Sequence, residues 1–347
     1  MVERYSPLFE RFQRKKLLEG ATPIQRLSRL EQSLGSAING VRIFVKRDDL
    51  MGLGGGGNKV RKLEFLLGEA LSQGCDTFVT MGGMQSNHAR LSAAAAALAG
   101  LACELVLTQL VPRTDESYRH NGNQLLYGIF GARVHPLSSG ENGLDFAKQR
   151  VEVLKNEGRR PYLVYSGGSS PVGCLGYAVC AVEIAGQERA IEGGFAHIIV
   201  PNGSSGTHAG LAAGFAAMKI NPARIRSYAV LTSAEKTQKI TCDLSNSTLA
   251  LIDPKESINS SAIDVVGDQL GEGYGIPTSA MLSAVRTLAQ TEGLLLDPVY
   301  SGKAFAGLLA AVRAGAYKPG DAVLFVMTGG LPGLFAYQPA FENASYK

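Results

Sequence analysis

The sequence contains no tryptophan, few aromatic residues and no strong excess of charge of either sign. Aromatic side chains make up 7% of its 347 residues, and 34 basic residues face 30 acidic ones, for a formal net charge of +4. No basic stripe accompanies this small excess, which argues against nucleic acid as the main partner. With 45% apolar and 18% charged residues, the composition is typical of a globular enzyme with two domains or one large domain.

Paired cysteines and long apolar runs are also missing. The five cysteines form no CxxC pair, and the five histidines show no spacing typical of metal ligands, so we expect no metal site. The longest apolar stretch, 91–107, contains Ser92, Gly100 and Glu104, which indicates helix, turn and strand rather than a membrane span. The N-terminal stretch is charged throughout, so we expect no secretory leader, a cytoplasmic location and reduced thiols.

Strand-like and helix-like segments alternate along most of the chain. Strands are predicted at 43–46, 77–80, 102–107, 132–134, 162–165, 197–200, 227–231 and 322–327. Helices are predicted at 59–73, 87–99, 117–130, 144–157, 175–185, 207–218, 279–292 and 303–314. This alternation predicts an α/β fold with mostly parallel sheets. Segment 232–265 is less periodic and indicates no clear element.

Glycine-rich loops follow several of the predicted strands. They lie within 82–92, 166–177, 201–215 and 326–337. Open parallel sheets bind ligands at the carboxyl ends of their strands. We therefore expect these loops to converge on one pocket.

Two of these loops have features of ligand sites. In "PNGSSGTHAGLAAGF", 201–215, free backbone N–H groups and a helix N-terminus favour an anion, although a plain tight turn is the alternative. The spacing matches neither a P-loop nor GxGxxG, so a phosphate monoester fits better than a pyrophosphate. In "GGMQSNHARLS", 82–92, Ser86 or Asn87 can cap a helix, and the polar side chains there could also hold a carboxylate.

The stretch "MGLGGGGNKVRKLE", 51–64, places a lysine where a glycine loop meets a predicted helix. A lysine that faces a phosphate-bearing aldehyde could form a Schiff base with it. The residues alone leave Lys59, Lys62 and Lys303 as candidates. Tyrosines in "GEGYGIPT" and "DPVYSGKA" suit proton transfer or ring stacking, but they could equally be packed at the bases of their loops.

Several motifs, taken together and in order, point to a known family. They are "GGGGNKVRKLEFLLGEAL", "GGMQSNHARL", "NGNQLLYGIFGA", "GSSGTHAGL", "GYGIPT", "LLLDPVYSGKAFAGL" and "TGGLPGLFAY". Over about 27–337 the chain resembles the D-cysteine desulfhydrase and 1-aminocyclopropane-1-carboxylate (ACC) deaminase family. These are pyridoxal-phosphate (PLP) enzymes with the tryptophan-synthase β-subunit fold, fold type II.

The resemblance implies a fold of two domains and a homodimer. A large domain, 1–51 plus 166–347, and a small domain, 52–165, would each contain an open twisted sheet, mostly parallel and flanked by helices. PLP would lie in the cleft between the domains.

The resemblance also implies roles for individual residues. Lys59 would hold PLP as a Schiff base and, once freed, remove the α-proton of a small amino-acid substrate. Asn87 would reach the pyridine hydroxyl, and Thr328 would face the pyridine nitrogen. The phosphate would be held by Gly203, Ser204, Ser205, Gly206 and Thr207. The substrate side would be formed by Gln85, Ser86, Asn87, Tyr274, Tyr300 and Ser301, with Ser86 and the two tyrosines also catalytic.

One position helps to choose an activity within the family. ACC deaminases resemble one another in having glutamate after the tyrosine of "DPVY", whereas desulfhydrases typically have threonine. This chain has Ser301, so we expect β-elimination of D-cysteine, or of a close relative, to pyruvate, ammonia and sulfide. ACC deaminase, L-cysteate sulfo-lyase and a β-replacement enzyme remain alternatives. The extra glycines before Asn58 lead to the hypothesis that they make room for an unusual substrate.

Overall fold

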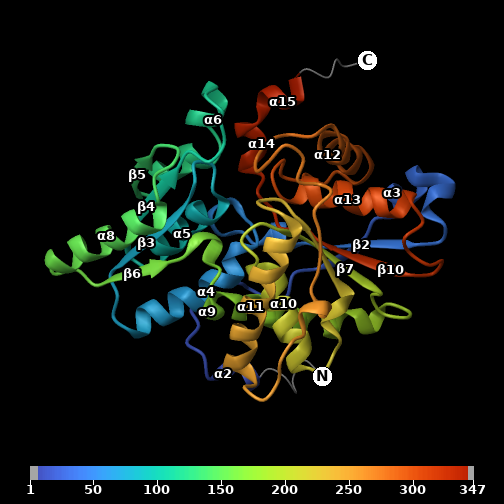
Figure 1. The fold of residues 1–347 in the computed structure, drawn as a ribbon, viewed down its shortest axis with the longest axis horizontal. Coiled ribbons are helices and arrows are strands. Elements are labelled where there is room, and N and C mark those ends of the chain that lie inside the picture. Colours follow the sequence, from blue (N-terminus) through green and yellow to red (C-terminus); the bar gives the residue numbers. More distant parts are fainter. Residues whose placement is uncertain (1–6, 343–347) are drawn as a thin grey trace.

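The computed structural model describes residues 7–342 and contains two mostly parallel sheets flanked by helices (Figure 1). The larger sheet has the strand order β1 (Ile24–Arg26), β2 (Arg42–Lys46), β10 (Ala322–Val326), β7 (His197–Asn202), β8 (Ile225–Ala229) and β9 (Asp264–Val266). The smaller has the order β5 (Arg133–Leu137), β4 (Ala102–Thr108), β3 (Thr77–Gly83) and β6 (Pro161–Val164). Among the strands of residues 7–342, β1 alone pairs antiparallel with its neighbour. The predicted α/β fold with two sheets is confirmed.

The strands of the larger sheet are apolar on both faces because helices cover both. In β10, Leu324 and Val326 pack into the core below the sheet, whereas Val323 and Phe325 pack into the core above it. The lower face is covered by α9 (Pro171–Gln187), α10 (Gly206–Ala217) and α11 (Ala234–Ile252). The upper face is covered by α3 (Ser28–Leu34), α12 (Ser279–Glu292) and α13 (Ser301–Arg313).

The smaller sheet is covered in the same way. Its hydrophobic clusters join it to α4 (Lys59–Ser72) and α5 (Asn87–Leu98) on one face and to α8 (Gly143–Asn156) on the other. All four of its strands fall within 52–165, the range predicted for the small domain. The domain bounds themselves stay a prediction. The remaining helices are α2 (Pro7–Glu10), α6 (Glu116–His120), α7 (Asn123–Ile129), α14 (Pro332–Ala336) and α15 (Gln338–Glu342).

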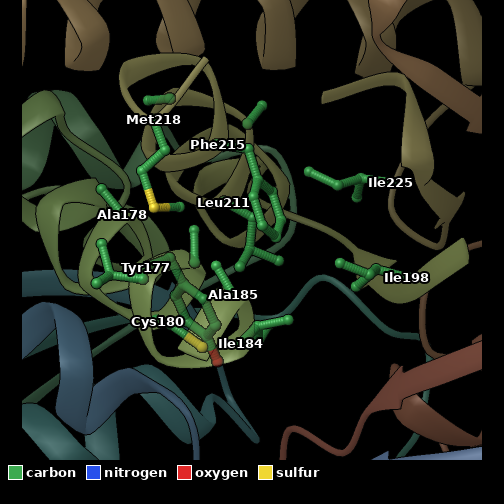
Figure 2. Packing of buried hydrophobic residues seen from close by; sticks show 14 of the residues in the cluster. Tyr177, Ala178, Cys180, Ile184, Ala185, Ile198, Leu211, Phe215, Met218 and Ile225 are labelled. Carbon is green, nitrogen blue, oxygen red and sulfur yellow. The ribbon is translucent and has the colours of Figure 1, made fainter. Parts of the chain in front are cut away.

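Close packing of α10 against α9 fixes where α10 begins. Leu211 and Phe215 of α10, and Met218 directly after it, pack among Tyr177, Cys180 and other buried side chains (Figure 2). A methyl group at Gly210 or Gly214 would collide with the α9 carbonyl of Cys174 or Ala178. Because these two positions are glycine, the helices approach backbone to backbone, and the loop before α10 is held rigidly.

Two sequence predictions need correction. The single helix predicted at 117–130 is wrong: α6 ends before Asn121, and α7 begins after Gly122, which has a φ of +63°. The helix α11, within the segment of weak periodicity, was not predicted because hydroxyl residues form much of its buried side. The hydroxyls of Thr241, Ser245 and Thr248 donate to carbonyls four residues earlier at 2.6–2.8 Å, so they are buried without leaving the helix.

Candidate active site

A cavity of about 810 Å³, including the part that opens to solvent, lies at the carboxyl ends of strands from both sheets. Gly82 and Gly83 come from the end of β3, Asn202 from the end of β7, and Thr328 from just beyond β10. Each of the four glycine-rich loops contributes to the wall. Their predicted convergence on one pocket is confirmed.

Most of the predicted site residues line this cavity. They are Lys59, Ser86, Asn87, Gly203, Ser204, Ser205, Thr207, Tyr274, Tyr300 and Thr328. Three others, Gln85, Gly206 and Ser301, do not form part of the wall.

Lys59 is the first residue of α4, and of the three candidate lysines it is the one in the cavity wall. Burial lowers the pKa of its ammonium group well below the ordinary value, and the nearby charge of Lys62 lowers it further. An amine that loses its proton easily can act as a nucleophile or a base near neutral pH. Lys62 and Lys303 instead donate to backbone carbonyls, Gly167 at 3.0 Å and Leu270 at 2.7 Å.

The loop before α10 presents an open helix N-terminus to the cavity. Ser205, which immediately precedes the helix, has a left-handed φ of +64°, and its side chain makes no capping hydrogen bond. The Gly206 N–H donates to the Ser204 carbonyl at 2.8 Å, whereas the N–H groups of Thr207 and His208 remain available to an anion. Asn58 donates to the hydroxyl of Thr207 at 3.1 Å, which ties this loop to the segment that carries Lys59.

A second positive group lies behind the same loop. The Nζ atom of Lys62 donates to the Ser169 hydroxyl at 2.9 Å, and Ser169 in turn donates to Ser204 at 2.8 Å. A methyl group at Gly206 would collide with this Nζ, so the amine lies directly against the loop. Burial lowers the pKa of Lys62 to about 8. Lys62 thus supports a negative charge on the loop when it is protonated.

The QSN segment supplies the opposite wall. Ser86 caps α5 by accepting from the N–H of Ala89 at 3.1 Å, so its own hydroxyl proton stays free to point elsewhere. Asn87 begins α5 and also lines the cavity. Gln85 is turned away: its amide donates to the carbonyls of Tyr118 at 2.6 Å and Asn121 at 2.9 Å. This geometry offers no support for Gln85 as a substrate ligand, and that role stays a prediction.

Ser301 is fully buried against Asp297 rather than facing the cavity. Its hydroxyl donates to the Asp297 carboxylate at 2.6 Å, and the Asp297 N–H donates back to that hydroxyl at 2.9 Å. Asp297 itself lines the cavity, and burial raises the pKa of its carboxyl group. The influence of Ser301 on a ligand would therefore pass through Asp297, a residue that sequence reasoning did not single out.

Other wall residues were also not predicted as site residues, among them Asn58 and His88. His88 is buried, its Nε2 lies 2.9 Å from the Thr80 hydroxyl, and its pKa is lowered well below the ordinary value by burial and by nearby lysines. It is therefore uncharged at neutral pH. Asn58 directly precedes the predicted Lys59, and His88 directly follows the predicted Asn87. This adjacency was the one signal in the sequence that could have identified them. Within residues 7–342 no group of three or more acidic, histidine or cysteine side chains could hold a metal ion.

The residues present fit PLP group by group. The uncapped start of α10 suits a phosphate dianion, and the buried amine of Lys59 suits an aldehyde. The Asn87 amide and the Thr328 hydroxyl are neutral groups suited to the polar atoms of a pyridine ring. One hydrogen bond joins the phosphate loop to Asn58, the residue before Lys59, and both Lys59 and the loop line the same cavity, so one ligand could engage both.

Comparison with known proteins agrees with this fit. The family profile described as "Pyridoxal-phosphate dependent enzyme" matches residues 15–329. The D-cysteine desulfhydrase of Serratia proteamaculans (strain 568) is 41% identical over 331 residues, which cover 94% of this chain and 97% of that protein. The D-cysteine desulfhydrase of Klebsiella pneumoniae (strain 342) is 40% identical, covering 95% and 97%.

Solved structures agree as well. The crystal structure of an ACC deaminase homologue has a TM-score of 0.85 and 36% identity, covering 96% of this chain and 97% of that one. A PLP-dependent aspartate racemase, at 16% identity and a TM-score of 0.62, shares the fold. No helix in the described part of the chain is both long and apolar enough to cross a membrane. The matched family profile and the two relatives show that this chain belongs to the pyridoxal-phosphate dependent enzyme family.

Proposed function

We propose that this enzyme is a PLP-dependent C–S lyase that eliminates the β-substituent of D-cysteine and yields pyruvate, ammonia and sulfide. The observation that carries the proposal is that one cavity contains the Lys59 amine, the open start of α10 and the paired hydroxyls of Tyr274 and Tyr300. The two desulfhydrases at about 40% identity over nearly the full length supply the substrate class.

Each wall residue has a role in this proposal. Lys59 would hold the cofactor through its amine and would also take the α-proton of the substrate, which its lowered pKa favours. PLP, when bound, supplies an electron sink for the negative charge that develops at the α-carbon. The Gly203–Thr207 loop holds the phosphate, and Asn87 and Thr328 hold the ring.

The remaining residues act on the substrate. The free O–H of Ser86 and the start of α5 bind the substrate carboxylate. The Tyr274–Tyr300 pair lies at the substrate side and supplies a proton to the leaving sulfur. Burial raises the pKa of both phenols, so both are protonated at neutral pH and can donate.

Ser301 favours elimination over the ACC deaminase alternative. A glutamate at this position would place a second carboxyl group beside the buried Asp297, whereas serine adds no charge. A ring that depends on neutral partners is a weaker electron sink, which is adequate when the leaving group is good. Cysteine has such a leaving group, and a cyclopropane does not.

A substrate panel tests the activity. The panel comprises D- and L-cysteine, D- and L-β-chloroalanine, L-cysteate and ACC, with the keto acid identified in each case. We expect pyruvate with sulfide from D-cysteine at the highest kcat/KM. Efficient production of 2-oxobutyrate from ACC would establish the deaminase instead, and sulfite release from L-cysteate would establish the sulfo-lyase.

A lysine substitution tests the cofactor site separately. Lys59→Ala is expected to remove the visible absorption band of bound PLP and to abolish borohydride trapping of the cofactor on the protein. Lys155→Ala serves as the control, because Lys155 is exposed and pairs only with Glu152 on α8. If the Lys59→Ala protein kept a trapped cofactor, the assignment of Lys59 would fail.

A homodimer, a cytoplasmic location and the predicted domain bounds complete the proposal. They rest on the family resemblance. Sedimentation equilibrium of the purified holoenzyme would test the dimer.

A further inference from the structure

Arg90 is a fully buried cation that has no carboxylate partner among residues 7–342. The other large buried guanidinium, that of Arg61, pairs with Asp48 at 2.9 Å and with Glu183 at 2.8 Å. Burial lowers the pKa of Arg90 to about 10, which leaves it charged at neutral pH. A buried charge without a counter-ion is costly, so its position calls for an explanation beyond packing.

Every side-chain hydrogen-bond partner of Arg90 among residues 7–342 is a neutral oxygen, and one of them, that of Asn87, belongs to a residue of the cavity wall. Its Nη1 donates to Asn123 Oδ1 at 2.9 Å and to Asn87 Oδ1 at 3.3 Å. Its Nη2 donates to the carbonyl of Gly56, in the glycine loop that precedes Lys59. Arg90 therefore connects the lysine loop, the start of α5 and the start of α7.

These contacts determine which way the Asn87 amide faces. A guanidinium only donates hydrogen bonds, so the amide atom that faces it must be the oxygen. Asn87 Oδ1 also accepts from Asn123 Nδ2 at 3.0 Å, which gives that oxygen two donors. The Nδ2 donor must then point to the other side, where it approaches Gly330: a methyl group there would lie 2.7 Å from it. No residue of the described chain accepts a hydrogen bond from this Nδ2, although Asn87 lines the cavity.

We propose that Arg90 is a positioning residue that fixes the Asn87 amide with its N–H donor toward the ring oxygen of PLP. This inference rests on the proposed contact between Asn87 and the cofactor. Without Arg90 the Asn87 oxygen would keep the Asn123 donor, but Asn123 would itself lose the guanidinium that orients its amide, so the Asn87 amide could rotate and turn its oxygen toward the negatively charged ring oxygen. The charge of Arg90 also polarises the Asn87 amide in the direction that strengthens its donor.

The competing explanation is that Arg90 only holds the glycine loop through the Gly56 carbonyl. That role would affect the stability of the protein but not the electronic state of the bound cofactor. The two explanations therefore predict different absorption spectra of bound PLP. They also differ in whether the effect of replacing Arg90 depends on the presence of Asn87.

The test is a double-mutant cycle with Arg90→Met, Asn87→Ala and the double variant. The readouts are the Kd for PLP added to the apoenzyme and the visible absorption band of the bound cofactor across pH. We expect Arg90→Met to weaken PLP binding by roughly tenfold or more, the change expected for a lost hydrogen bond to a charged group. The band should shift toward the shorter wavelengths of a cofactor with a protonated ring hydroxyl. In the Asn87→Ala background, Arg90→Met should change Kd by less than about twofold.

Matched variants keep the outcome decisive. Arg150→Met removes a half-buried arginine that pairs with Glu104 outside the cavity, and it should leave the band unchanged. If Arg90→Met does not fold, Arg90→Lys keeps the charge but cannot reach all three oxygens, so a smaller change in the same direction is expected.

The results separate the inference from the proposal beneath it. If Asn87→Ala leaves PLP binding and the band unchanged, the proposed contact of Asn87 fails, and the inference fails with it. If Asn87→Ala changes PLP binding and the band but Arg90→Met does not, only the positioning role of Arg90 is overturned. The same holds if the effects of the two substitutions on the free energy of PLP binding are additive.

Discussion

The hydroxyl oxygens of Tyr274 and Tyr300 lie 2.6 Å apart in the cavity wall, although the two residues belong to different segments. Tyr300 immediately precedes α13, where its N–H donates to Asp297 at 2.8 Å. Tyr274 lies in the loop 267–278, whose backbone is held by Lys303 of α13. The first turn of α13 thus organises both phenols of the pair.

Removing either phenol oxygen should impair the chemical step. We expect Tyr274→Phe and Tyr300→Phe each to lower kcat/KM for D-cysteine by roughly 10²-fold, within the range for general acid–base groups. Because the hydroxyls share one hydrogen bond, the double variant should be far less impaired than the product of the two effects. Steady-state kinetics would measure this. Tyr317→Phe is the control, since the buried Tyr317 hydroxyl has no hydrogen-bond partner within the part of the chain that the structure describes, and a loss of activity there would undermine the interpretation.

Lys303 should matter through the loop that carries Tyr274. Its Nζ donates to the carbonyls of Leu270 at 2.7 Å and Gly273 at 3.0 Å, while Tyr337 donates to Gly275 at 2.8 Å. Lys303→Met removes two of these three hydrogen bonds. We therefore expect kcat/KM for D-cysteine to fall by roughly tenfold, with the PLP absorption band unchanged. Tyr337→Phe, which removes one tie, should have a smaller effect in the same direction. A loss of the band in Lys303→Met would instead indicate a direct role at the cofactor.

Anion binding by the apoenzyme should depend on pH through Lys62. Burial lowers the pKa of Lys62 to about 8, so this group loses its proton as pH rises through that value. A phosphate on the Gly203–Thr207 loop favours the charged form, and binding therefore takes up a proton above pH 8. We expect the affinity for inorganic phosphate to fall between about pH 8 and 10, by up to about tenfold per pH unit.

Calorimetry in buffers of different ionisation enthalpy would measure this proton uptake. Lys62→Met is expected to bind phosphate more weakly at pH 7 and to show little change in affinity from pH 8 to 10. The same pH dependence in Lys62→Met as in the wild type would assign the proton to another group.

The glycines before Asn58 serve the backbone rather than the substrate. None of residues 52–57 lines the cavity, so the hypothesis that they make room for an unusual substrate lacks structural support. Gly56 has a φ of +82°, and a methyl group there would lie 2.6 Å from the carbonyl oxygen of Asp49. We expect Gly56→Ala to lower the free energy of unfolding by at least about 2 kcal/mol.

Gly52→Ala is the matched control for this substitution. Gly52 has an ordinary φ of −68°, and a methyl group there would meet nothing within 4 Å. The free energy of unfolding of the Gly52→Ala variant should therefore stay within about 0.5 kcal/mol of the wild-type value. Chemical denaturation would measure the free energy of unfolding of both variants. Equal values would contradict the prediction, because they would show that the loop can move to accommodate a methyl group at position 56. Both should keep the substrate profile of the wild type.

The fold class and the position of the pocket could be predicted from the sequence. Helices such as α12, at Ser279–Glu292, were predicted with their observed bounds because apolar residues repeat with helical spacing. Glycine loops after buried strands predicted the convergence at one sheet edge, since parallel strands end on the same side. These features are local in the chain, so a single sequence contains them. Helix α11 was missed because the hydroxyl residues on its buried side hide the apolar period.

Which side chains face the cavity could not be predicted from the sequence and depends on the folded chain. The sequence does not distinguish Lys59 from Lys62 and Lys303 as the lysine of the site. In the structure Lys59 lines the cavity wall, whereas the other two donate hydrogen bonds to carbonyls of distant loops. Gln85 and Ser301 look like site residues and turn elsewhere, whereas Arg90 acquires its place from contacts with the distant Asn123 and Gly56. Side-chain direction depends on hydrogen bonds between residues far apart in the chain, such as Arg90 and Gly56, and local spacing does not specify these pairs.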